Sequence, residues 1–343
     1  MDYNAINAKV SGMFGRLMKR SDYESLSRLQ SLDEAGHALQ SNPSYARVLE
    51  PGLTHIHRDT IERKLLLSLY ADYNRLYEFV SSVRLRKFLD AYILKHEIQA
   101  IKLMLCMAYD ERDISQDLEG AEMLFPKRRH VDVDQLRKAY SVPELIEGLS
   151  GTEFHTLLSR VYNKDSSLFD LESQLDLYYY KHLNECIDEY LDKPDAKIMR
   201  KIVGMETDLH NISWIYRLKT YYRVDRDLIY AHLMPPMFRL GKNHLKELIA
   251  TNSLEEFKNV IHNGPYAREF GSGTNLDPDA VCERELGRLY TTMRRRHTRS
   301  TVPIIAYMYF KEKEIRNLTS LFEGIRYRLA PQEIMRIIGG ELS

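Results

Sequence analysis

The sequence predicts an all-α protein built from three similar helical repeats. Glycine and proline are scarce, at 16 and 11 of 343 residues, and apolar residues recur at helical spacing. One pattern of motifs also occurs three times along the chain, and no series of alternating, turn-bounded strands accompanies it. One stripe at helical spacing consists of Leu65, Leu69, Tyr73, Leu76, Val80 and Val83.

Composition excludes several classes of protein. The 49 basic residues equal the 49 acidic ones, so no net field draws the whole molecule to nucleic acid or an anionic membrane. The three cysteines have no C-x-x-C spacing, which argues against a disulfide or zinc framework. No run of about 18 apolar residues occurs and the N-terminus has no apolar signal segment, so we expect neither a membrane span nor secretion.

Each repeat opens with the pattern Ser-x-x-Glu. The three pairs are Ser31 with Glu34, Ser141 with Glu144, and Ser253 with Glu256. In this capping box, the serine hydroxyl accepts a hydrogen bond from the third helical amide, and the glutamate accepts one from the amide of the capping residue. The pattern therefore predicts three helices that begin in the same way.

Two further motifs follow each capped helix in the same order. A turn-prone stretch leads to an aromatic residue 13 or 14 positions after the serine, namely Tyr45, Phe154 and Tyr266. A glutamate three positions before a leucine then opens a long helical stripe, at Glu62, Glu172 and Glu283. The order and spacing predict one sequence repeat that is present in three copies.

The last motif of each copy carries an acidic residue within a helix. The segments are KHEIQAIKLML, ETDLHNISWIY and EKEIRNLTSLF, with the acids at Glu97, Asp208 and Glu314. The capping serines lie 110 and 112 residues apart, which sets the repeat length. We expect repeats over residues 1–115, 116–225 and 226–343, with approximate boundaries and with the N- and C-terminal helices as candidates to pack together.

The three acids raise the question of a carboxylate active site. Such a site needs an acid or base partner and convergence on one ligand. Lys311 and Lys313 lie three residues and one residue before Glu314. An apolar residue follows each acid, which is typical of the edge of a buried helix face. We therefore favour a structural role in the repeats for Glu97, Asp208 and Glu314. Asn211 and Asn317 are their expected polar partners inside the same helices. An enzyme with a carboxylate site is the alternative.

Other motifs point to no metal, cofactor or nucleotide site, and no residue is assigned as catalytic. His55 and His57 lack further ligands, and GSGTN at 271–275 lacks the Lys-Ser/Thr of a phosphate loop. Two basic clusters occur in this neutral chain, so solvated faces or local contacts to an acidic protein partner are favoured over nucleic-acid binding. The clusters are Lys127, Arg128 and Arg129, and Arg294, Arg295 and Arg296.

Three segments resemble the C subunit of the bacterial and archaeal V-type (A/V-type) rotary ATPases, which is related to the d subunit of eukaryotic vacuolar ATPases. They are YMYFKEKEIRNLTSLFEGIRYRLAPQEIMRIIGG at 307–340, DLHNISWIYRLK at 208–219, and the N-terminal Tyr3, Asn7, Ala8, Lys9, Val10, Met13 and Leu17. The chain departs from the family at Lys9, where arginine is common. It also has Met234-Pro235-Pro236-Met237 where a Pro-Gly-Gly-like turn is common.

The resemblance implies a non-catalytic subunit whose three helical bundles surround a pseudo-threefold axis as a funnel. It implies a position as a socket between the central-shaft subunits and the membrane proteolipid ring, peripheral on the cytoplasmic side. The complex would either hydrolyse ATP to pump ions or synthesise ATP, and the ion would be either a proton or sodium. A helical-repeat scaffold or adaptor outside any ATPase is the alternative that the periodicity leaves open.

Overall fold

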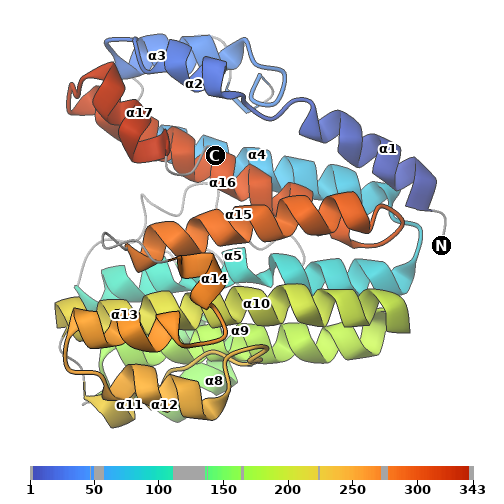
Figure 1. The fold of residues 1–343 in the computed structure, drawn as a ribbon. Helices are drawn as coiled ribbons and strands as arrows, with labels where there is room; N and C mark the ends of the chain where they lie inside the picture. Colours follow the sequence, from blue (N-terminus) through green and yellow to red (C-terminus); the bar gives the residue numbers. More distant parts are fainter. Residues whose placement is uncertain are drawn as a thin grey trace. The chain divides into compact units, whose positions relative to one another are not determined.

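The computed structural model describes residues 3–46, 48–49, 58–110, 136, 138–163, 166–222, 225–271 and 277–339. Every regular element in these residues is helical, so the predicted all-α class is confirmed (Figure 1). The chain divides into two compact units. Unit 1 contains residues 1–82 and 277–343, and unit 2 contains residues 83–276.

Unit 1 combines the two ends of the chain. Its helices are α1 (Tyr3–Phe14), α2 (Arg20–Leu26), α3 (Leu32–Gln40), α4 (Arg58–Phe79), α15 (Pro278–Arg296), α16 (Val302–Arg326) and α17 (Pro331–Gly339). The long helix α16 packs against α4, α15, α17 and α1, and also against α2 and α3. The N- and C-terminal helices therefore share one body.

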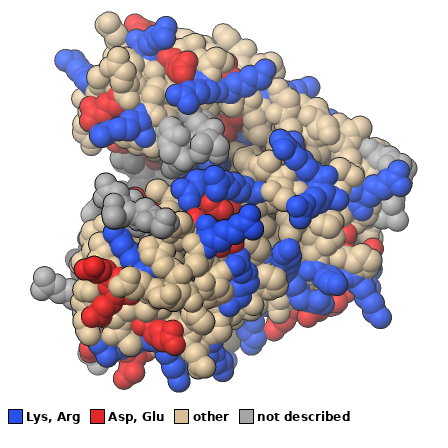
Figure 2. Space-filling model, viewed as in Figure 1, with Lys and Arg blue, Asp and Glu red and all other residues tan. Residues whose placement is uncertain are grey.

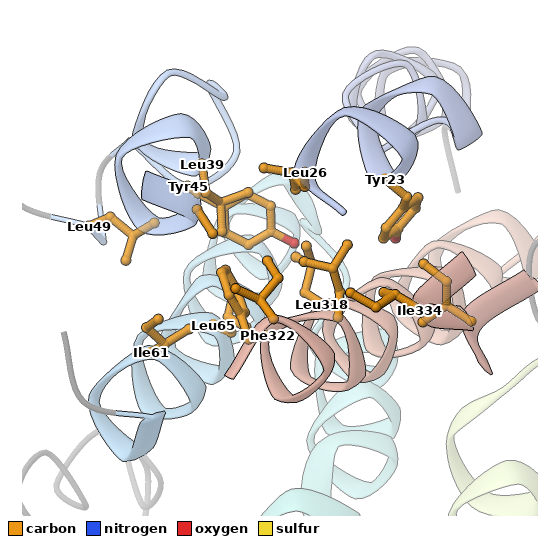
Figure 3. Close-up of a cluster of buried hydrophobic side chains, with 14 residues drawn as sticks. Tyr23, Leu26, Leu39, Tyr45, Leu49, Ile61, Leu65, Leu318, Phe322 and Ile334 are labelled. Atoms are coloured by element: carbon orange, nitrogen blue, oxygen red, sulfur yellow. The ribbon is translucent and has the colours of Figure 1, made fainter. Parts of the chain in front are cut away.

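An apolar core joins α2, α3, α4, α16 and α17. It includes Leu39 from α3, Leu65 from α4, Leu318 and Leu321 from α16, and Ile334 from α17, each buried to 1% exposure or less. Figure 3 shows side chains of α2, α3 and the following turn facing those of α4 and α16. Burial of each such side chain contributes about 1.5–3 kcal/mol, so the sequence-distant ends are held by ordinary hydrophobic packing.

The predicted apolar stripe on the first long helix ends at Val80, three residues earlier than expected. Leu65, Leu69, Tyr73 and Leu76 are buried on α4, and Val80 is buried just after it. Val83 is the first residue of the next helix and is 66% exposed. Residues 80–82 are not helical and separate α4 from the next helix, so the helical spacing does not continue to Val83.

Unit 2 contains the middle of the chain. Its helices are α5 (Val83–Tyr109), α7 (Val142–Gly148), α8 (Glu153–Val161), α9 (Leu168–Tyr190), α10 (Lys193–Arg217), a π-helical turn (Leu218–Tyr222), α11 (Arg226–Ala231), α12 (Lys242–Ala250), α13 (Leu254–His262) and α14 (Ala267–Phe270). Helices α5 and α9 pack together extensively, and α10 packs against α9 (Figure 1). The short helices α11 to α14 pack in sequence, each against the next.

One order of elements occurs three times in the described chain. A capped short helix (α3, α7 or α13) precedes a long helix (α4, α9 or α15), and a longer helix (α5, α10 or α16) follows. The recurring leucines Leu65, Leu175 and Leu286 are all buried. The repeat boundaries near residues 115 and 225 stay a prediction.

Within the residues that the structure describes, no helix is both long enough and apolar enough to cross a membrane.

Candidate functional site

The three serines cap their helices as predicted. The hydroxyl oxygens of Ser31, Ser141 and Ser253 accept hydrogen bonds from the amides of Glu34, Glu144 and Glu256, at 3.1–3.4 Å. The glutamates differ in one detail from the expected box. Each carboxylate accepts from the amide one residue before the serine, at Gln30, Tyr140 and Asn252.

Glu314 is a buried carboxylate with three donors, two of which come from distant parts of the sequence. The Tyr45 hydroxyl and the Met18 amide donate to its two oxygens, and the Lys311 ammonium lies 2.7 Å from Oε1. Glu314 is 4% exposed and Lys311 is fully buried. The carboxylate therefore ties the N-terminal segments to α16 through charge-assisted hydrogen bonds.

Tyr45 contacts both charged groups of this cluster. The Lys311 ammonium also lies 3.9 Å from the centre of its ring, so the ring and the carboxylate share one cation. Burial, reinforced by the charge of Glu314, raises the pKa of Tyr45 well above its ordinary value. The hydroxyl therefore stays protonated and acts as a donor over the whole physiological pH range.

Asp208 makes a comparable cluster in unit 2. The amides of Phe238, Arg239 and Leu240 donate to its carboxylate at 3.1, 2.6 and 3.0 Å, and the Tyr266 hydroxyl donates at 2.8 Å. Asp208 is fully buried. Burial, followed by the charge of Asp208, raises the pKa of Tyr266. The Arg239 guanidinium lies over the Tyr266 ring, 4.4 Å from its centre.

Glu97, the third acid, is buried in α5 of unit 2. The remaining aromatic of the motif, Phe154 of the second copy, has no hydroxyl to donate. Phe154 is fully buried and meets Tyr178 edge to face, with ring centres 6.0 Å apart. The second copy thus has an apolar contact where the other two copies have a tyrosine hydroxyl.

The two tyrosine bonds connect different copies of the motif. Tyr45 belongs to the first copy and binds Glu314 of the third, while Tyr266 of the third copy binds Asp208 of the second. Both of these capped helices thus lead to an aromatic that reaches the acid of another copy. The described donors to Glu314 and those to Asp208 belong to separate segments and do not overlap.

The two asparagines expected beside the acids differ in their partners. Asn211 binds outside its own helix, because its Nδ2 donates to the Met234 carbonyl and its Oδ1 accepts from the Met234 amide. Asn317 is 2% exposed, and its Oδ1 is buried without a hydrogen-bond partner in the described structure.

Only one of the two basic clusters falls in the described residues. Lys127, Arg128 and Arg129 lie outside them, as do His55, His57 and residues 272–275 of the glycine-rich segment. Arg294, Arg295 and Arg296 form the last turn of α15. Arg294 lies 3.8 Å from the centre of the Phe14 ring, and burial, then the charge of Arg295, lowers its pKa.

Arg295 and Arg296 are exposed. On the face drawn in Figure 2, basic and acidic side chains occur together, with the basic ones gathered in clusters. Such a surface favours local charged contacts over one large field.

Sequence reasoning missed the donors that complete the carboxylate clusters. Tyr45 and Tyr266 are recognised as recurring aromatics, yet their hydroxyls are not assigned to the acids. Lys311 carries a detectable signal, since it lies three residues before Glu314 and shares its helix face. The amides of Met18 and residues 238–240 carry none, because any residue supplies an amide.

Fold and clusters together define an all-helical protein in which tyrosine hydroxyls bind buried carboxylates far away in the sequence. Comparison with known proteins identifies the family, because the chain matches the ATP synthase (C/AC39) subunit family over residues 6–337. The chain belongs to this family.

Several archaeal proteins of the family are similar along most of their length. The C subunit of the A-type ATP synthase of Methanosarcina acetivorans is 25% identical over 322 residues, which cover 92% of this chain and 87% of that protein. The protein of the same name from Methanococcoides burtonii is 24% identical over 345 residues, covering 98% and 93%. That of Methanocaldococcus jannaschii is 22% identical, covering 98% and 86%.

Proposed function

We propose that this protein is the rotor socket of a rotary ATPase, a non-catalytic subunit that joins the central shaft to the membrane proteolipid ring. The observation that carries the proposal is the family match over nearly the whole chain. Relatives named as the C subunit of A-type ATP synthases cover the chain equally fully. The protein associates peripherally with the complex on the cytoplasmic side of the membrane.

The arrangement proposed for the socket is a funnel of three helical bundles around a pseudo-threefold axis. Three capped helices, each followed by the same order of long helices, support a threefold body. Two of the capped helices lead to tyrosines that bind acids of other motif copies. Such cross-ties suit a part that transmits torque, because a stiff body loses less rotation to internal deformation.

Glu97, Asp208 and Glu314 serve this body as structural carboxylates. The Asn211 side-chain amide also has a structural role, because it binds the main chain of Met234. A general base needs an open oxygen within reach of a substrate proton. Asp208 is fully buried and accepts four hydrogen bonds, and Glu314 is neutralised by Lys311. Saturated carboxylates of this kind support stability and leave catalysis to other subunits of the complex.

The contacts to shaft and ring require local recognition, because the chain has no net charge. The exposed Arg295 and Arg296 are candidates for one of these contacts, together with Lys127, Arg128 and Arg129. Removal of both exposed arginines is expected to weaken one interface and its salt dependence without unfolding the chain.

Affinity isolation of the tagged chain from gently solubilised membranes tests the proposal. We expect the central-shaft subunits and the proteolipid ring to accompany it in stable proportion. A helical adaptor outside the ATPase is the competing function. Recovery of other partners without any rotor subunit would favour that adaptor and reject the socket.

A further inference from the structure

A pocket of about 430 Å³ lies beside Glu314 in unit 1. Its walls include Phe310 and Asn317 of α16, Arg288 and Thr291 of α15, and Leu17 from the segment after α1. The volume lies in the range of ordinary ligand-binding pockets. The walls combine apolar surface with a few polar groups.

Asn317 is the polar group in this pocket that lacks a partner. Its side chain is 2% exposed, it lines the pocket, and its Oδ1 has no hydrogen-bond donor in the described structure. A buried amide oxygen without a donor is costly and rare in folded proteins. The pocket therefore offers one acceptor to a ligand that carries an N–H or O–H group.

Unit 2 shows what the same position binds when it is occupied. Asn211 lies three residues after Asp208, as Asn317 lies three residues after Glu314. The Asn211 Nδ2 donates to the Met234 carbonyl at 2.9 Å, and the Met234 amide donates to Asn211 Oδ1 at 2.8 Å. The occupant there is polypeptide main chain, held by both of its polar groups.

The segment leading to the carboxylate differs between the two units. In unit 2, the segment that begins at Met234 reaches Asp208 at Leu240, 13 residues before Ser253. In unit 1, Met18 reaches Glu314 and also lies 13 residues before its serine. Helix α1 ends at Phe14, and only residues 15–17 lie between it and Met18. Unit 1 therefore has no described counterpart of the Met234 segment at Asn317.

We propose that the pocket beside Asn317 binds an extended polypeptide segment of a neighbouring subunit. A main-chain N–H of that segment donates to Asn317 Oδ1, and an adjacent apolar side chain lies against Leu17 and Phe310. This inference rests on the proposed function, since the occupant belongs to the rotary complex. A free anion fits less well, because both cations of the pocket wall have carboxylate partners. Arg288 lies 2.8 Å from Glu285, Lys313 lies 4.0 Å from Glu283, and Glu314 adds a carboxylate to the wall.

Photo-crosslinking in the assembled complex tests the site. Arg288 lines the pocket and its side chain is 65% exposed, so p-benzoylphenylalanine at this position reports on the occupant. Ala280 is exposed on the same helix, is not among the pocket residues, and serves as the control position. We expect a light-dependent crosslink from position 288, mapped by mass spectrometry to one segment of one partner protein, and none from 280.

A pair of matched variants separates binding from stability. Asn317→Leu keeps the approximate shape and removes the amide, so it should reduce the crosslink about tenfold and leave the unfolding temperature of the isolated chain unchanged or raised. Asn211→Leu should lower that temperature, because it leaves the Met234 amide and carbonyl unpaired.

Three results would overturn the inference. A chain that assembles with the complex but gives no crosslink from position 288 rejects the pocket and leaves the socket role standing. Equal destabilisation of the isolated chain by Asn317→Leu and Asn211→Leu makes the amide purely structural. A chain that does not assemble with rotor subunits rejects the socket and the pocket together.

Discussion

At the scale of single residues, buried carboxylates organise both units. Glu314 and Asp208 each accept a tyrosine hydroxyl and at least one main-chain amide from a distant segment. A buried charge is tolerated only when it is paired and hydrogen-bonded, so the donors are as necessary as the acids.

Removal of the tyrosine hydroxyls measures their contribution. Tyr45→Phe and Tyr266→Phe should each lower the free energy of unfolding by about 1–3 kcal/mol, because each leaves a buried carboxylate with one donor fewer. Denaturant unfolding of the purified variants gives the value. Tyr327→Phe is the control, since Tyr327 is 62% exposed and should change stability by less than about 0.5 kcal/mol.

Phe154 provides an internal comparison, because it already lacks the hydroxyl. Phe154→Ala should cost about 3–5 kcal/mol through the loss of packing alone. Equal stability of wild type, Tyr45→Phe and Tyr266→Phe would contradict a role for the hydroxyl bonds.

At the scale of elements, much of the fold could be predicted because its signals are local. Helical spacing identifies the long helices, and Ser-x-x-Glu identifies where α3, α7 and α13 begin. The apolar spacing predicts a stripe that extends to Val83, because it continues across the non-helical residues 80–82. The pairing of Tyr45 with Glu314 was not predictable, since no local pattern reports contacts across 269 residues.

Loss of the helix caps is the first test at this scale. Ser31→Ala, Ser141→Ala and Ser253→Ala should each cost about 0.5–2 kcal/mol, because each leaves an amide of the first turn without its acceptor. Thermal unfolding provides the measurement. Three variants that all unfold like the wild type would show that the shared capped start does not stabilise these helices.

The contact between α16 and α17 depends on a glycine. A Cβ added at Gly324 would lie 2.7 Å from Cγ1 of Ile334, so Gly324→Ala forces the Ile334 side chain on α17 to shift and should cost about 1–3 kcal/mol. Gly12 in α1 has no neighbouring atom within 4 Å of such a Cβ. Gly12→Ala should therefore stabilise the chain by about 0.5–1 kcal/mol. The same sign for both changes in urea unfolding would contradict this account.

At the scale of the whole molecule, the sequence motifs predict the family more readily than they predict the contacts with other subunits. The family match covers residues 6–337, yet sequence gives no means to decide which exposed side chains would form the proposed contacts to shaft and ring. Interface residues carry no periodic signal, because their partners lie on other chains. Asn317 illustrates the point, since its lack of a donor becomes apparent only in three dimensions.

The isolated chain should not bind ATP. Its glycine-rich segment at 271–275 lacks the Lys-Ser/Thr that holds nucleotide phosphates and Mg²⁺. Isothermal titration calorimetry with Mg-ATP should give no binding heat at micromolar affinity. Stoichiometric binding would indicate a nucleotide-dependent role and contradict a purely mechanical one.

Coupling between ATP hydrolysis and ion transport tests the socket most directly. Complexes reconstituted with and without this chain are compared for hydrolysis by the catalytic head and for ion uptake into vesicles. We predict that omission abolishes ATP-driven ion uptake and leaves hydrolysis by the soluble head active, because torque no longer reaches the ring. Full ion uptake in the absence of the chain would contradict the socket, and loss of hydrolysis by the isolated head would instead place the chain's role in the catalytic part.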